Sequence, residues 1–232
     1  MKTSTSVVTA HTDNQSLTRI IELFEQCRAF EASNNIAEAR KIEKKIAALV
    51  AEVAAASPNS SDHADALAYH EYTLLSLART SKRQSVSQSL RDAAYSKGAA
   101  AVSIRLTLPK PDMGTVFAAY NLAIDLIIGE KRAAIGLSWM LTARKLLNKL
   151  AGKKKLPPNI LQFKLYSMDY GIAKAYYDLG RLKEAQYTLK RALSHATVLN
   201  KSTWSELRGV SKCSELLAQI KLDQMPLNKT SS

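Results

Sequence analysis

The sequence predicts an all-α protein made of about nine helices, most of them paired as antiparallel hairpins. Only 8 glycines and 6 prolines occur among 232 residues, and a composition so poor in helix breakers favours long helices. Apolar residues recur at three- and four-residue steps along most of the chain, which is the spacing of one helix face. No segment of the sequence shows the sustained alternation of apolar and polar residues that is typical of a half-buried strand. We therefore expect helices and no sheet.

Turn-forming residues divide the chain into these helices. Asn34 and Asn35 can take the left-handed conformation of a hairpin turn. Pro109 and Pro111 place a loop before residue 112 because each disfavours helix in the residue before it, and Asp112 can cap the helix that follows. The expected helices cover residues 14–30, 36–56, 63–79, 83–104, 112–128, 131–150, 161–179, 182–196 and 203–222. The helical domain then spans residues 14–224, and the flanking residues 1–13 and 225–232 are expected to be disordered tails.

The clearest hairpin lies between residues 161 and 196. Its first helix is apolar on one face up to Gly180, and a second apolar stripe begins at Leu182. The turn between them is too short for anything but an antiparallel pair. Small and aromatic residues occupy regular positions on both helices, namely Ala173, Tyr176, Gly180, Ala185, Leu189 and Ala192.

These six positions resemble the motif of a tetratricopeptide repeat (TPR), a unit of about 34 residues in which two helices pack through small residues at their crossing. Two positions depart from the motif: Asp169 stands at the usual tryptophan position, and Thr197 stands where a proline often closes the repeat. Any alanine-rich pair of helices is the alternative interpretation. A weaker copy of the spacing occurs near the start of the chain, at Cys27, Phe30, Asn34 and Ala39.

The four expected hairpins begin 46 to 50 residues apart, which is longer than the family unit. The resemblance implies a TPR-like α-solenoid with lengthened helices, and a plain helical bundle remains the alternative. Because terminal helices of a solenoid must cover its open ends, residues 203–222 are expected to cap the stack.

Composition also limits the cellular setting. The first residues contain no apolar core long enough for export, and no apolar run approaches the ~20 residues of a membrane span. We therefore expect a cytoplasmic protein. Cys27 and Cys213 lie far apart on amphipathic segments and are expected to be buried as small apolar side chains in a reducing compartment.

Charge is unevenly distributed along the chain. The net charge is +13, yet residues 1–78 carry 7 Lys/Arg and 10 Asp/Glu, whereas residues 79–232 carry 26 and 10. An excess of this size in the second part suggests an anionic partner. Solubility alone is the alternative explanation.

Two candidate binding surfaces follow from these patterns. In the resemblance, the first helix of each repeat lines a concave groove, which places Tyr170, Lys174, Tyr177 and Asp178 in the groove of the last repeat, and Phe24, Arg28 and Glu31 in that of the first. Tyr170, Lys174 and Tyr177 share one strip by helical geometry and suit an extended peptide or a partner helix. The alternative is that the tyrosines pack against neighbouring helices.

The second candidate surface is a basic patch. Its members are Arg144, Lys145, Lys149, Lys153, Lys154, Lys155, Arg181, Lys183, Lys190 and Arg191. Part of this charge is explained by the favourable interaction of cations with a helix C-terminus. If the patch reaches phosphates, binding to nucleic acid would be non-specific and dependent on salt.

The sequence contains no recognisable catalytic motif. His63 and His70 are seven residues apart but have no third ligand at helical spacing, so no metal site is expected. We expect a non-enzyme with no cofactor, namely an adaptor or scaffold that binds a peptide, a helix or an acidic protein surface in the groove. The alternative is a nucleic-acid-associated protein that uses the basic surface of residues 79–232.

Overall fold

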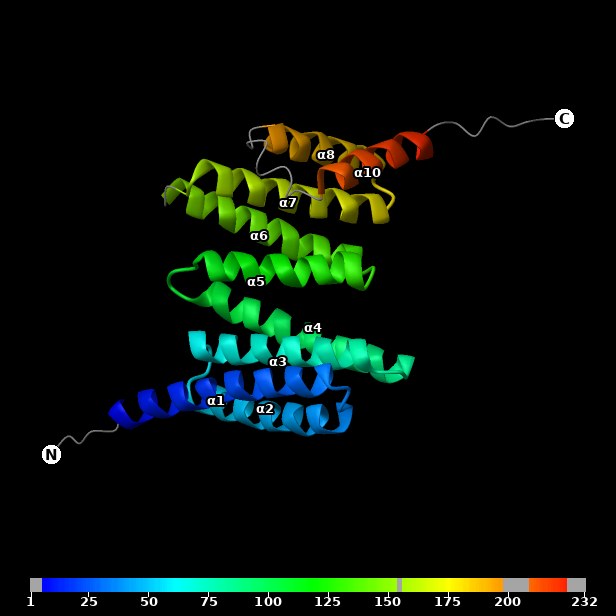
Figure 1. Ribbon diagram of the computed structural model, residues 1–232. Helices are drawn as coiled ribbons and strands as arrows, with labels where there is room; N and C mark the ends of the chain where they lie inside the picture. The colour runs from blue at the N-terminus through cyan, green and yellow to red at the C-terminus, as the bar shows by residue number, and fades with distance from the viewer. Residues whose placement is uncertain (1–5, 154–155, 198–208, 225–232) are drawn as a thin grey trace. The chain divides into compact units, whose positions relative to one another are not determined.

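The structure is a computed structural model that describes residues 6–153, 156–197 and 209–224; for residues 6–14, 153 and 209–211 it describes the backbone only. All regular structure in these residues is helical, which confirms the predicted all-α class (Figure 1). The described part contains nine α-helices and one π-helical turn, η1. They are α1 (Ser6–Ala32), α2 (Ile36–Ala56), α3 (Ser61–Thr80), α4 (Gln84–Thr107), α5 (Met113–Ile124), η1 (Asp125–Gly129), α6 (Ala133–Lys153), α7 (Pro158–Asp178), α8 (Leu182–Thr197) and α10 (Gly209–Asp223).

The helices form two compact units, which divide between Pro111 and Asp112, within the loop that the prolines predict. In the first unit, α1 packs on α2, α3 packs on α4, and α3 contacts both helices of the first hairpin. In the second unit, α5 packs on α6, α6 on α7, α7 on α8, and α10 contacts both α7 and α8. Each unit is therefore a stack of consecutive antiparallel hairpins, as in a helical-repeat solenoid (Figure 1).

Some helix boundaries differ from those expected. Helix α1 begins at Ser6, ahead of Asn14, where the sequence predicted its start. Near Gly129, α5 continues as the π-helical turn, and the left-handed residue of this connection is Lys131, with φ 54°. Asp112 caps α5 as predicted, with its carboxylate accepting from the Thr115 N–H at 3.0 Å. The tail at residues 225–232 and the expected residues 203–208 of the last helix lie outside the described residues.

The turns of the first and last hairpins have the same geometry. Asn34 has φ 59° and Gly180 has φ 72°, so both are left-handed. The Asn35 N–H donates to the Phe30 carbonyl at 2.7 Å, and the Arg181 N–H donates to the Tyr176 carbonyl at 2.9 Å. With the additional bonds Asn34 N–H to Glu31 and Gly180 N–H to Tyr177, each turn is a Schellman motif that satisfies the last carbonyls of its helix. The equivalence of Asn34 and Gly180, predicted from spacing, is confirmed.

Small residues are buried where the paired helices meet. Ala173, Ala185, Leu189 and Ala192 are fully buried and belong to one apolar cluster of the second unit. In the first unit, Cys27 and Ala39 are buried in an apolar cluster of α1, α2, α3 and α4. Cys27 and Cys213 are buried free thiols, as expected, and burial is the main cause that raises the pKa of Cys27 to about 12.

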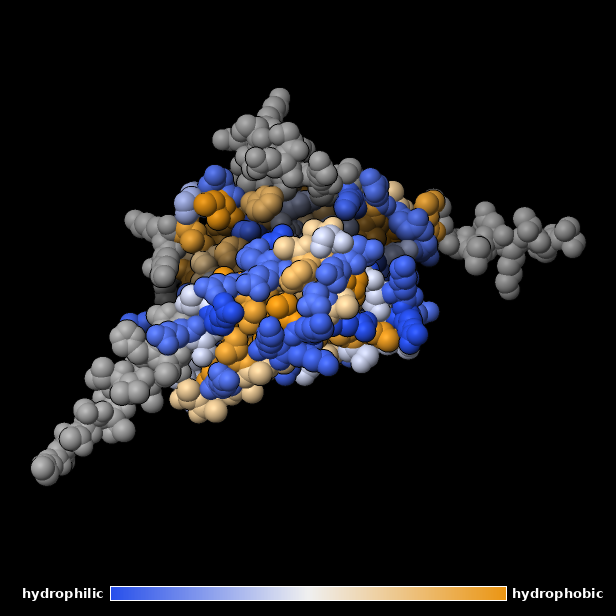
Figure 2. Space-filling view, turned by 60° about the horizontal axis from the view of Figure 1, so that its bottom comes forward, coloured by the Kyte–Doolittle hydropathy of each residue, from blue (hydrophilic) through white to orange (hydrophobic). Residues whose placement is uncertain are grey.

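The outer surface combines polar and apolar side chains. Figure 2 shows hydrophilic residues over much of the face in view, with hydrophobic residues between them. Within the described ranges, no helix combines the length and the apolar character needed to cross a membrane.

Candidate functional site

The strip of α7 that the sequence placed in the groove is packed against α10. Tyr170 is half-buried and contacts the cluster that contains Cys213 and Ile220 of α10. Burial is the main cause that raises the pKa of Tyr170, and the nearby Cys213 is the next largest. The Tyr177 hydroxyl donates to the Asp223 carboxylate at 2.8 Å. These tyrosines therefore contact another helix of the same chain, which matches the alternative interpretation of the strip.

The polar members of this strip pair with each other. Lys174 forms an ion pair with Asp178 one turn along α7, and its ammonium lies 5.7 Å from the centroid of the Tyr177 ring. Pairs of this kind on a helix surface contribute little to stability. Since Lys174 already has a carboxylate partner, it is a weaker candidate for an acidic ligand than a cation without one.

The corresponding residues of the first hairpin are also engaged within their unit. The Phe24 ring meets the Tyr69 ring edge to face, with 5.4 Å between centroids. The Glu31 carboxylate accepts a hydrogen bond from the Ser76 hydroxyl of α3. Arg28 is exposed, lies over the Phe24 ring and forms an i,i+3 ion pair with Glu25 at 3.5 Å. Phe24 and Glu31 thus join α1 to α3, and Arg28, like Lys174, already has a carboxylate partner on its own helix.

A buried carboxylate of the second unit, which sequence patterns did not identify as a site, accepts hydrogen bonds from two neighbouring helices. The Asp169 side chain of α7 is 0% exposed. Arg144 of α6 donates to it through Nε at 2.5 Å and Nη2 at 3.3 Å, and Arg191 of α8 donates through Nε at 2.7 Å and Nη2 at 2.8 Å. His195 Nε2 lies 3.3 Å from the same carboxylate. One negative charge therefore holds three helices together, and it stands at the position where the TPR motif usually has tryptophan.

The two arginines leave a positive excess at a pocket of about 400 Å³ between α6, α7 and α8, which we call the α6–α8 pocket. Two guanidinium groups share one carboxylate, and hydrogen bonding to that carboxylate raises the pKa of Arg191 above its ordinary value. The pocket also contains Lys183, whereas Glu184, the acid of its described lining, is paired with Arg181 at 2.8 Å. The lining residues are Leu141, Arg144, Ile172, Tyr176, Lys183, Glu184, Tyr187, Thr188 and Arg191.

Apolar surface adjoins this charge. Tyr187 is 68% exposed, and Leu141 is also an exposed apolar side chain. The Arg191 guanidinium lies 6.0 Å from the centroid of the Tyr187 ring. Cations, an exposed aromatic ring and an exposed leucine thus line the same pocket, and this combination suits a ligand that is both acidic and apolar.

The predicted basic patch is divided by the structure. Arg144, Lys183 and Arg191 line the α6–α8 pocket, and Arg181 is paired with Glu184 beside it. Lys145 and Lys149 on α6 and Lys190 on α8 are exposed and do not line the pocket. The Lys153 side chain and residues 154–155 lie outside the described residues. The clustering of basic residues along the sequence indicates the patch, but only the fold shows that two of its arginines, Arg144 and Arg191, bind the same carboxylate, Asp169.

Among the residues with described side chains, no group of three or more His, Cys, Asp or Glu could hold a metal ion. In comparisons with known proteins, no protein-family model matches the chain, and no curated protein matches it. The fold and the α6–α8 pocket therefore supply the arguments about function.

Proposed function

We propose that this chain is a TPR-like helical-repeat adaptor that binds an acidic, partly apolar segment of a protein partner in the α6–α8 pocket. The observation that carries the proposal is the sharing of one buried carboxylate, Asp169, by Arg144 and Arg191. Because one acid cannot neutralise two guanidinium groups, the pocket keeps a positive charge that a ligand carboxylate can compensate.

The repeat character of the proposal is supported by the two equivalent hairpins. The turns at Asn34 and Gly180 share one hydrogen-bond pattern, and Ala39 and Ala185 are both fully buried at the matching positions of the following helices. Hairpins that repeat in this way build extended binding surfaces in helical-repeat proteins.

The chemistry of the ligand is supported by the lining of the pocket. Each arginine has five N–H donors and uses only two groups, Nε and Nη2, on Asp169. Their side chains are 19% and 34% exposed, so the remaining donors are partly accessible from the pocket. Tyr187 and Leu141 offer area to an apolar side chain next to that acid. A peptide with neighbouring acidic and apolar residues satisfies both features.

Fluorescence anisotropy with a labelled peptide of mixed glutamate and leucine tests this proposal at physiological salt. Lys183→Glu should weaken binding by about tenfold, because it places a negative charge in the pocket without touching the Asp169 pairs. Lys190→Glu is the matched control, since it makes the same charge change at an exposed position of the same helix outside the pocket. Equal loss in the two variants would contradict a local site.

A single-stranded oligonucleotide of similar charge serves as the second probe. The proposal expects oligonucleotide binding only at low salt, because a diffuse positive field is screened as ionic strength rises. Oligonucleotide affinity that survives physiological salt and falls equally with Lys183→Glu and Lys190→Glu would favour the nucleic-acid alternative over the adaptor.

A further inference from the structure

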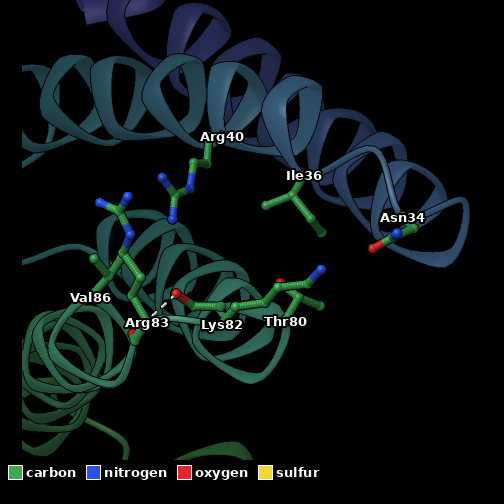
Figure 3. A pocket seen from close by; sticks show the side chains of 8 residues that line it. Asn34, Ile36, Arg40, Thr80, Lys82, Arg83 and Val86 are labelled. Carbon is green, nitrogen blue, oxygen red and sulfur yellow. Dashed lines mark hydrogen bonds between the residues drawn. The ribbon is translucent and has the colours of Figure 1, made fainter.

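A second pocket, also of about 400 Å³, lies within the first unit, where the turn between α3 and α4 faces the start of α2. It is separate from the α6–α8 pocket and shares no residue with it. Figure 3 shows its lining: Arg40 reaches down from α2, while Lys82 and Arg83 come from the turn before α4.

The charge of this pocket is of one sign. Arg40, Lys82 and Arg83 line it, and its described lining contains no Asp or Glu. The guanidinium groups of Arg40 and Arg83 point toward one another in Figure 3. In the part of the chain that the structure describes, no ion pair joins any of these three side chains to a carboxylate, whereas the neighbouring Lys41 is paired with Glu38 at 2.6 Å. Like charges that converge without an acid between them favour the binding of an anion.

The backbone adds further positive potential. Helix α4 is 24 residues long, and its N-cap residue, Arg83, makes no capping hydrogen bond with its side chain. The Ser81 hydroxyl instead donates to the Arg83 carbonyl at 3.4 Å. Because the first N–H groups of a helix have no partner within the helix, they and the helix dipole add to the attraction of the three cations for a negative charge.

We propose that this pocket binds a phosphate monoester group. Three cations and a helix N-terminus together match a dianion better than a single carboxylate, and the planar guanidinium groups fit pairs of phosphate oxygens. Thr80 and Ser81 also line the pocket, and Ile36 and Val86 provide an apolar wall for the group that carries the phosphate. The phosphate can belong to a small organic molecule or to a phosphorylated side chain, since both present the same group.

Titration of the ¹⁵N-labelled full chain with phenyl phosphate tests this site, with ionic strength held constant by chloride. The expected result is a saturable shift of the amide signals of Ile36 and of the first turn of α4. Arg40→Gln and Arg83→Gln should each weaken binding about tenfold or more, as the loss of a charge-assisted hydrogen bond does. Lys44→Gln is the control, because Lys44 is an exposed cation of the same helix, α2, outside the pocket.

The outcomes separate the possibilities. Shifts that do not saturate, or an equal loss of affinity in Lys44→Gln, would overturn the proposal. If either arginine variant fails to keep the signals of the folded protein, Lys82→Gln replaces it, with the same expected loss. A peptide with and without phosphoserine identifies the source of the phosphate: tighter binding than phenyl phosphate supports a phosphorylated partner, and weaker binding supports a small molecule. Lys183→Glu should leave the affinity for phenyl phosphate unchanged, so the experiment tests this site independently of the α6–α8 pocket.

Discussion

Replacement of Asp169 by asparagine tests the organisation of the second unit. The variant keeps the size of the side chain but removes the negative charge that Arg144 and Arg191 share. Removing one partner of a buried ion pair typically destabilises a protein by 3–5 kcal/mol, because the remaining charge is left without compensation. Here the arginine side chains are 19% and 34% exposed and can regain some hydration. We therefore expect the free energy of unfolding to fall by about 3 kcal/mol, at the lower end of that range.

Tryptophan fluorescence during urea unfolding measures this effect selectively. Trp139 lies in α6 of the second unit, and neither of the two tryptophans of the sequence falls within residues 1–111, so the signal does not report the first unit. Asp178→Asn is the matched control, because the ion pair of Asp178 among the described residues is the i,i+4 pair with Lys174, and its loss should change stability by less than about 1 kcal/mol. If Asp169→Asn loses no more stability than Asp178→Asn, the shared carboxylate does not hold α6, α7 and α8 together.

Three further predictions concern packing and pH in the same unit. Gly136→Ala should destabilise it by about 1–3 kcal/mol, because the new Cβ would lie 2.5 Å from Ile127 Cγ1 and 3.0 Å from the Ala123 carbonyl oxygen. On the same helix, the Cβ of Gly152→Ala would meet no atom within 4 Å, so this control should be neutral or stabilising in urea unfolding. Burial lowers the pKa of His195 below 6.5, so the unfolded state binds the proton more tightly than the folded state. The free energy of unfolding should therefore decrease as pH falls below 6.5 toward the folded-state pKa. His195→Gln should reduce the slope of the free energy of unfolding against pH, and an unchanged slope would contradict this prediction. Ile220→Ala removes a fully buried side chain and should weaken the docking of α10 by about 2–3 kcal/mol. Amide hydrogen exchange should then accelerate more in α10 than in α5, and equal acceleration in both helices would refute this prediction.

The sequence predicts those features of the fold that depend on local spacing. Apolar residues at three- and four-residue steps identify the helices because one face of each must be buried, and Asn34 and Gly180 identify two turns because few other residues tolerate the left-handed conformation. The cap at Asp112 follows from its place before an apolar run. Each of these signals lies within a few residues of the structure that it predicts.

The sites depend on contacts between distant segments, and local patterns do not show them. Asp169 is one more polar residue on an amphipathic helix until α6 and α8 bring Arg144 and Arg191 to it from 25 and 22 residues away. Arg40 and Arg83 line one pocket although they are on different hairpins. The strip of Tyr170 and Tyr177 has the spacing of a binding surface, but the same spacing serves equally well to pack α10.

Paramagnetic relaxation enhancement locates a peptide that is bound in the α6–α8 pocket. A nitroxide-labelled peptide of mixed glutamate and leucine is added to the ¹⁵N-labelled chain at physiological salt, and broadening of each amide signal reports its distance from the bound peptide. We predict strong broadening at Leu141, Tyr176 and Tyr187, which line the pocket from α6, α7 and α8. Broadening that is centred on Lys145 and Lys149, or that spreads evenly over the basic surface, would contradict it.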